Sequence, residues 1–201
     1  MTGSATIYSP DSMSYDVYCY RAESGTPDPE EAEAFIEGLE EREEAGGAEV
    51  ASSATREAIV AALLGHNPRL ERFEFDYREI AAIRKISESE ARARYQYAQL
   101  TPPEGDLAIQ LTVHEDHVFI SIPYWYKGGA ADPVFSALTG YVRVIGETVG
   151  FFVYDPQTGK AFDPQNADFR DHSEYERVVR DVVPKFVAEA DKPAKPWWRF
   201  W

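Results

Sequence analysis

The stretch that decides the fold is Leu107–Tyr126, LAIQLTVHEDHVFISIPYWY. Apolar residues at 107, 109, 111 and 113 alternate with Ala108, Gln110, Thr112 and His114, and the alternation resumes at 118, 120 and 122. Alternation with a period of two places one set of side chains on each face of a strand. Two such runs around the short polar turn at Glu115 and Asp116 predict an antiparallel hairpin.

Working outward from this hairpin, patterns of period two and of period 3.6 follow one another along the chain. They predict strands over 14–20, 70–77, 95–100 and 151–154, and helices over 29–45, 54–64, 78–94, 132–149 and from 173 onward. The helical stretch over 78–94 is either continuous or broken near Ser87. Because the central pair is a hairpin and not a β-α-β crossover, the sheet should be largely antiparallel. We expect an α+β fold with about five to six strands and helices packed mainly on one face.

Several sequence signals predict where these elements begin and end. Asp132 is expected to cap a helix with Pro133 in its first turn, and Ser87 with Glu90 and Ser173 with Glu176 match the pattern of a capping box. In the predicted strand over 70–77, Phe73, Phe75 and Tyr77 fall on one side. Residues 155–159, DPQTG, predict a turn.

Length and composition favour one domain. The chain has 201 residues, 44% of them hydrophobic and 13% aromatic, which is typical of a folded globular protein. We interpret residues 1–12 as an unstructured leader, 13–190 as a single α+β domain and 191–201 as an aromatic C-terminal tail. Met13 is an alternative to Met1 as the start of translation.

Charge and cysteine content exclude some classes of function. A net charge of -15 argues against nucleic acid as a partner, because binding to phosphates relies on Lys and Arg. The single cysteine, Cys19, allows no internal disulfide and is expected in the core. No cationic and apolar leader and no run of about 20 apolar residues is present, which favours a cytoplasmic protein and disfavours the membrane.

The residue types that carry chemistry have simpler structural interpretations. His114 and His117 should face each other across the turn with Glu115 and Asp116 at its tip, but a polar, exposed turn is favoured over a metal site, which needs three or four converging ligands. The segment 158–160, TGK, lacks the upstream glycines of a phosphate loop. We therefore assign no catalytic residue, no metal and no cofactor, and an enzyme is the less favoured class.

Two surface segments are unusual. Residues 28–44 hold nine acidic residues and one basic residue, which is more than half of the net charge. Such a helix is either a solvated face or a docking surface for a basic partner. The candidate partner-binding residues are Glu33, Glu37, Glu40, Glu41 and Glu44, with Tyr124, Trp125 and Tyr126 as aromatic anchors.

The tail, DKPAKPWWRFW, carries three of the four tryptophans of the chain. Four aromatic side chains left in water would be an apolar liability, so Trp197, Trp198, Phe200 and Trp201 should dock on a surface. Three surfaces are candidates: the protein's own sheet or helices, a partner protein or second copy of the chain, and a membrane. The acidic charge of the chain disfavours the membrane.

Four segments together suggest a family. MSYDVYCY from Met13, the hairpin ending IPYW, GFFVYDPQTGK and the terminal PWWRFW resemble small bacterial proteins, some of which are candidate immunity proteins of polymorphic toxin systems. The resemblance implies inhibition of a toxin by tight binding and carries over no catalytic residue.

The leading hypothesis is thus a non-enzymatic acidic binding protein of the immunity type, with a basic toxin domain as its partner. One alternative is an enzyme or small-ligand-binding domain with a pocket near the central hairpin and the Asp155 turn. Another is a structural subunit that forms oligomers through its tail.

Overall fold

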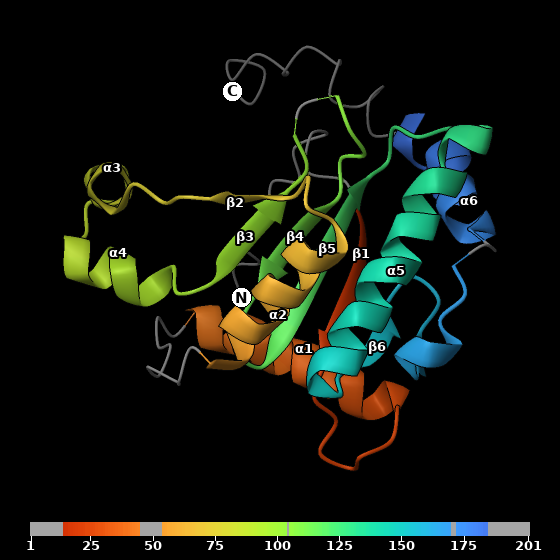
Figure 1. The fold of residues 1–201 in the computed structure, drawn as a ribbon, viewed down its shortest axis with the longest axis horizontal. Coiled ribbons are helices and arrows are strands. Elements are labelled where there is room, and N and C mark those ends of the chain that lie inside the picture. Colours follow the sequence, from red (N-terminus) through yellow and green to blue (C-terminus); the bar gives the residue numbers. More distant parts are fainter. Residues whose placement is uncertain (1–13, 45–53, 104, 170–171, 185–201) are drawn as a thin grey trace, which may run out of the picture.

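A computed structural model describes residues 14–44, 54–103, 105–169 and 172–184, with only the backbone described for residues 40–44. The predicted tail anchors Trp197, Trp198, Phe200 and Trp201 lie outside these residues, as does the predicted leader. Within this part, seven strands form one antiparallel sheet in the order β2-β3-β4-β5-β1-β6-β7 (Figure 1). The strands are β1 (Ser14–Tyr20), β2 (Glu71–Phe73), β3 (Ala98–Thr101), β4 (Gln110–Val113), β5 (His117–Pro123), β6 (Phe152–Asp155) and β7 (Lys160–Phe162).

Six α-helices accompany the sheet, which confirms the predicted α+β class. They are α1 (Pro29–Glu44), α2 (Ala54–His66), α3 (Tyr77–Arg84), α4 (Glu88–Arg94), α5 (Asp132–Val149) and α6 (Ser173–Asp181). Two short 3-10 helices, η2 (Gly128–Ala130) and η3 (Pro164–Asn166), flank α5. The sheet has one strand more than the upper end of the predicted range.

The main core lies between the sheet and the pair α2 and α5. Alternate residues of the central strands, among them Val17, Leu111 and Ile120, pack there against Leu63 of α2 and Leu138 of α5. The central hairpin has the predicted register, with Leu111 opposite Ile120 and Val113 opposite Val118. We call the side of the sheet that faces this core the first face.

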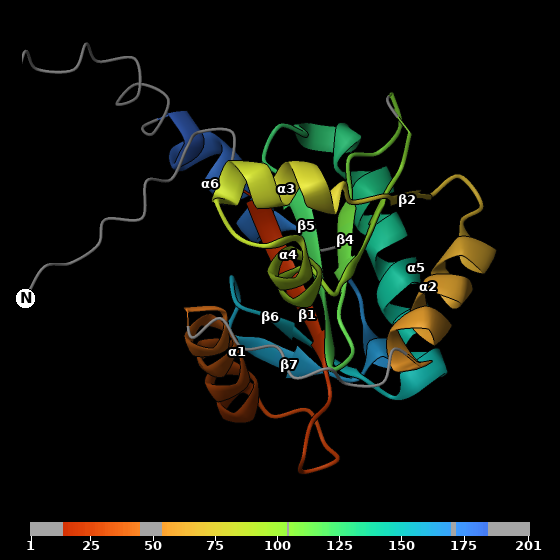
Figure 2. The same ribbon diagram turned by 90° about the vertical axis from the view of Figure 1, so that its left-hand side faces the viewer.

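Helix α1 packs on the opposite, second face of the sheet. Figure 2 shows α1 on one side of the strands and α2 with α5 on the other. A smaller apolar cluster forms there from Tyr20 and Tyr154 of the strands and Ala32 of α1, with Phe35 and Ile36 packed against it. The predicted apolar stripe of the helix over 29–45 therefore has a sheet surface to cover.

Helix α6 closes the end of the sheet where β5 finishes. The buried Tyr175 hydroxyl donates to the carbonyl of Pro123 (2.8 Å) and accepts from the backbone N–H of Tyr126 (3.1 Å). Its ring contacts Phe135 of α5 and Tyr15 of β1. One side chain thus links three elements.

The structure corrects several predicted boundaries. The strand predicted over 70–77 ends at Phe73, because Asp76 accepts from the N–H groups of Arg78 and Glu79 and starts α3 at Tyr77. The N-cap of α5 is Ala131, so Asp132 is the first helical residue. Likewise Ser173 begins α6, and its N-cap His172 makes no side-chain capping bond. The Ser87 cap on Glu90 is confirmed.

Candidate functional site

The part of the second face farthest from β6 carries a row of aromatic rings. Because opposed residues of antiparallel neighbours share a face, Phe73 of β2 lies on the same side as Gln99 of β3, and Tyr97 lies two residues before it. Ring centroids are 5.1 Å apart for Phe73 and Phe75, for Phe75 and Tyr97, and for Tyr97 and His114. The row therefore crosses three neighbouring strands.

The row continues to α1 through the two histidines of the central hairpin. The rings of His114 and His117 are stacked with centroids 4.1 Å apart, and His117 contacts Phe35 of α1 at 5.8 Å. A hollow of about 330 Å³ lies here between α1 and the strands. Its lining consists of Tyr18, Ile36, Leu39, Tyr97, Thr112, His114, His117 and Phe119.

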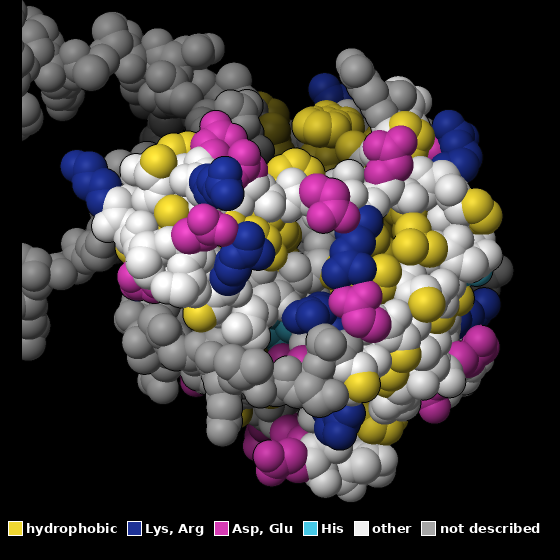
Figure 3. Space-filling view, turned by 60° about the vertical axis from the view of Figure 1, so that its left-hand side comes forward, with side chains coloured by type: hydrophobic (Ala, Val, Ile, Leu, Met, Phe, Trp, Pro, Cys, Tyr) yellow, Lys and Arg dark blue, Asp and Glu magenta, His cyan; other side chains and the backbone are white. Residues whose placement is uncertain are grey.

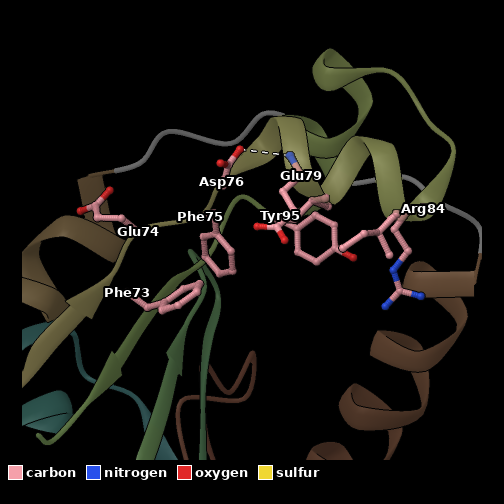
Figure 4. Close-up of a pocket in the computed structure, with 9 residues that line it drawn as sticks. Phe73, Glu74, Phe75, Asp76, Glu79, Arg84 and Tyr95 are labelled. Carbon is pink, nitrogen blue, oxygen red and sulfur yellow. Dashed lines mark hydrogen bonds between the residues drawn. The ribbon is translucent and has the colours of Figure 1, made fainter.

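A second hollow of about 490 Å³ lies at the other end of the row, where α3 stands over β2. Figure 4 shows the rings of Phe73, Phe75 and Tyr95 beneath α3, with Glu74 and Asp76 on one side. Ile80, Ile83, Glu79 and Arg84 of α3 complete the lining. The ring contacts of Tyr97 with Phe75 and Tyr95 join the two hollows. We call the surface formed by the linings of both hollows the aromatic cleft.

Two large apolar side chains of the aromatic cleft are exposed to solvent. Phe73 of β2 is 52% exposed and Ile83 of α3 is 69% exposed, and both line the larger hollow. Most large apolar side chains of the described chain are buried or half-buried, so these two mark a surface that differs from the rest.

The larger hollow is acidic. Glu74, Asp76 and Glu79 line it against one basic residue, Arg84. Within the described chain, the neighbouring helix α4 is instead balanced by ion pairs, Arg92 with Glu88 (2.8 Å) and Arg94 with Glu90 (2.6 Å). Figure 3 looks onto the side that carries α3 and α4 and shows basic side chains beside acidic ones. The charges of α4 are therefore paired, whereas the lining of the larger hollow holds three carboxylates against one guanidinium.

The histidine turn has the predicted geometry but a structural role. The N–H of His114 donates to the carbonyl of His117 (2.9 Å), which closes the hairpin around Glu115 and Asp116. Contrary to the exposed turn that the sequence predicts, His117 is 7% exposed, and its Nδ1 lies 2.7 Å from Asp116. No group of three or more metal-ligating side chains occurs among the described residues.

Glu115 explains why this turn is acidic. Its two carboxylate oxygens accept from the backbone N–H groups of Thr55 and Arg56, both at 3.1 Å. These are among the N–H groups that have no partner within helix α2. Desolvation opposes ionisation, but the hydrogen bonds and the charge of Arg56 lower the pKa of Glu115.

Two other residues with potential chemistry are structural as well. Cys19 is fully buried, and burial raises the pKa of its thiol far above the ordinary value. The turn after β6 is held by Asp155, which accepts from the N–H of Gln157 (2.9 Å) and from the hydroxyl of Tyr15 (2.5 Å). The TGK segment leads from this turn into β7, since Lys160 pairs with Asp155 across the strands.

The predicted partner-binding residues are not brought together. Glu33 and Glu37 are exposed on α1, while the side chains of Glu40, Glu41 and Glu44 lie outside the described residues. Trp125, 64% exposed, and its neighbours Tyr124 and Tyr126 follow the end of β5. Helix α1 follows Tyr20, which pairs with His117 at the start of β5, so the two groups lie at opposite ends of that strand.

Tyr124 and Tyr126 have intramolecular contacts that occupy part of each side chain. Tyr124 stacks on Tyr175 with ring centroids 5.1 Å apart, and the Tyr126 hydroxyl accepts from the N–H of Ala108 (2.6 Å). Trp125 is therefore the most accessible of the three predicted anchors.

The aromatic cleft itself was not predicted from the sequence. The alternation of Phe73, Phe75 and Tyr77 was recognised, but only as one side of a strand, without a role for that side. The signal that could have identified an exposed surface is position: Phe73 ends the edge strand β2, and Phe75 lies between β2 and the start of α3. Only the strand order places them next to Tyr97 and His114.

The fold and the site together define an α+β protein with helices on both faces of its antiparallel sheet (Figure 2) and an acidic, aromatic cleft on the second face. Compared with known protein families, with curated proteins and with solved structures, the chain matches none of them. Within the described residues, no helix combines the length and the apolar character that crossing a membrane requires.

Proposed function

We propose that this chain is a non-enzymatic binding protein whose aromatic cleft binds an apolar, basic segment of another protein. The observation that carries this proposal is the exposure of Phe73 and Ile83, from two different elements, in the lining of one hollow. Burying a fully exposed side chain of this kind contributes about 1.5–3 kcal/mol, so a ligand that covers the exposed parts of both gains about 2–4 kcal/mol of binding energy.

The charge of the cleft supports a basic ligand. Glu74, Asp76 and Glu79 surround the exposed rings. Aromatic faces attract Lys and Arg side chains, and nearby carboxylates strengthen this preference. The same charges disfavour nucleic acid, although rings exposed on a sheet otherwise suit stacked bases.

Within this class we propose an immunity-type inhibitor that neutralises a basic toxin domain. The net charge of -15 supports it, because opposite charge accelerates the association of two proteins. Exposed Glu33 and Glu37 on α1 extend the acidic surface on the same face of the sheet as the cleft. Protection of cells from a toxin encoded by a neighbouring gene tests this finer proposal.

The experiment for the binding role is a selection from a random peptide library on the full chain. We expect enriched peptides that combine Trp or Phe with Lys or Arg, and their binding should weaken at least about tenfold in a Phe73→Ser/Ile83→Ser double variant. Both side chains are exposed, so the melting temperature should change little.

The matched control is Trp125→Ser, which removes an equally exposed aromatic side chain at the far end of β5. It should leave the binding of the selected peptides unchanged. Equal binding to the double variant and to the wild type, or no enrichment at all, contradicts the assignment of the cleft.

A second candidate is the binding of a small molecule in the smaller hollow. The Asp116 carboxylate, 2.7 Å from His117 Nδ1, fixes the orientation of that ring, and about 330 Å³ is enough for a small ligand. A ligand there should be displaced by Thr112→Trp, which fills the smaller hollow, and not by Phe73→Ser.

A further inference from the structure

The sequence itself contains a segment with the chemistry that the aromatic cleft selects. Residues 191–201, DKPAKPWWRFW, lie outside the described residues and hold four aromatic residues, three basic residues and one acidic residue. Trp and Arg are the side chains most often found as anchors in binding interfaces. The larger hollow offers the complement, with exposed apolar side chains and three carboxylates against one guanidinium (Figure 4).

The connecting chain is long enough to reach the cleft. Described structure ends at Pro184, and residues 185–196 precede the first tryptophan of the tail. Twelve residues span up to about 40 Å when extended. A folded domain of this size has a radius of gyration of about 15 Å, so the extended connector is about as long as the diameter of the domain.

We propose that the C-terminal tail, residues 191–201, occupies the aromatic cleft of the same chain and competes there with the partner. This inference rests on the proposed function, because it names the cleft as the binding site. Tethering raises the effective concentration of the tail to the millimolar range. A contact with only millimolar affinity is then enough to keep the cleft about half occupied, and a tighter partner still displaces the tail.

Tryptophan fluorescence of the full chain tests the proposal directly. Trp125 is the one tryptophan of the described residues, so a Trp125→Phe variant reports Trp197, Trp198 and Trp201 alone. We expect blue-shifted emission and weak quenching by acrylamide in this variant. Adding Phe73→Ser and Ile83→Ser should shift the emission to the red and strengthen the quenching at least about twofold, while the far-ultraviolet circular dichroism spectrum stays unchanged.

The matched control replaces Ala93, an exposed residue of α4 outside both linings, with Ser in the Trp125→Phe background and should change neither signal. Identical emission with and without the two cleft substitutions overturns the proposal. So does emission that changes with protein concentration, because the tail then binds a second copy, as sedimentation would show.

A competition experiment separates this proposal from the proposed function. A variant with Trp197, Trp198, Phe200 and Trp201 all changed to Ser should bind a library-selected peptide at least about twofold more tightly than the wild type, because half occupancy by the tail doubles the apparent Kd of a competitor. Equal affinities overturn the tail proposal and leave the binding function standing. If the cleft substitutions shift the fluorescence but the library yields no enriched peptide, the contact of the tail with the cleft is supported and an external partner is contradicted.

Discussion

At the scale of single residues, Glu115 shows how one side chain connects elements that are far apart in sequence. It lies in the turn between β4 and β5, yet it accepts from the N–H groups of Thr55 and Arg56 at the start of α2. A carboxylate in this position satisfies two otherwise unpaired donors and meets the positive end of the helix dipole. The hairpin thereby fixes where α2 sits on the first face.

We expect Glu115→Ala to lower the free energy of unfolding by about 1 kcal/mol at pH 7, the usual effect of removing a helix cap. The pKa of Glu115 is lowered in the folded protein, so its contribution is complete above the ordinary pKa of 4.5 and is lost as pH falls through the folded value. Urea unfolding should therefore show a larger difference between variant and wild type at pH 7 than at about pH 3.

The control for this prediction is Glu115→Gln, which keeps one acceptor oxygen. It should retain part of the stabilisation at both pH values, because an amide does not titrate in this range. A pH-independent effect of Glu115→Ala would mean that the side chain acts through packing and not through its charge.

Residue-level patterns predicted Cys19 in the core correctly, because the strand alternation and the small apolar side chain both indicate burial. They missed the burial of His117, because burial there comes from Phe35 on α1, a contact across about eighty residues of sequence. They also missed the role of Glu115, since nothing in the turn indicates which backbone N–H groups will lie nearby.

At the scale of elements, the contact between α5 and η3 depends on a glycine. A β-carbon on Gly146 would lie 2.4 Å from Cγ and 2.7 Å from Cβ of Pro164, whose ring is buried and rigid. On α1, a β-carbon on Gly38 would meet no atom within 4 Å. The two glycines sit inside helices, so the same substitution tests packing at one position and helix propensity at the other.

Gly146→Ala should therefore destabilise the protein by about 1–3 kcal/mol, because overpacking outweighs the gain in helix propensity. Gly38→Ala should instead stabilise it by about 0.5–1 kcal/mol. Chemical denaturation of both variants measures the two signs. A stabilising Gly146→Ala would show that η3 moves away without cost.

Elements were predictable where one face is buried and the pattern is long. The helix α5 shows this best, with Val134, Leu138, Val142 and Ile145 buried at helical spacing. The strand β7 was missed because three residues are too few for an alternating pattern, and it forms only by pairing with β6. The strand β2 was predicted too long, because the Asp76 cap competes with strand pairing for the same residues.

At the scale of the whole molecule, the β2 end of the sheet buries fewer apolar residues than its centre. Helix α5 buries six residues, whereas α3 and α4 each bury one, Ala81 and Ala91 respectively. The edge strand β2 is exposed along its three residues. The cleft is thus built on a part of the molecule that buries few apolar residues, as is common for binding surfaces.

This difference predicts how the backbone exchanges hydrogen with solvent. Local unfolding of the unit formed by β2, α3 and α4 exposes little apolar surface, so its amides should exchange at least about 100-fold faster than those of β1, β4 and β5. Mass spectrometry of the full chain after deuterium labelling measures both groups at once. Uniform protection would mean that the unit unfolds only with the whole domain.

A ligand bound in the aromatic cleft contacts this unit on one side and the stable strands on the other, so it should slow exchange over residues 71–84 while leaving β1 unchanged.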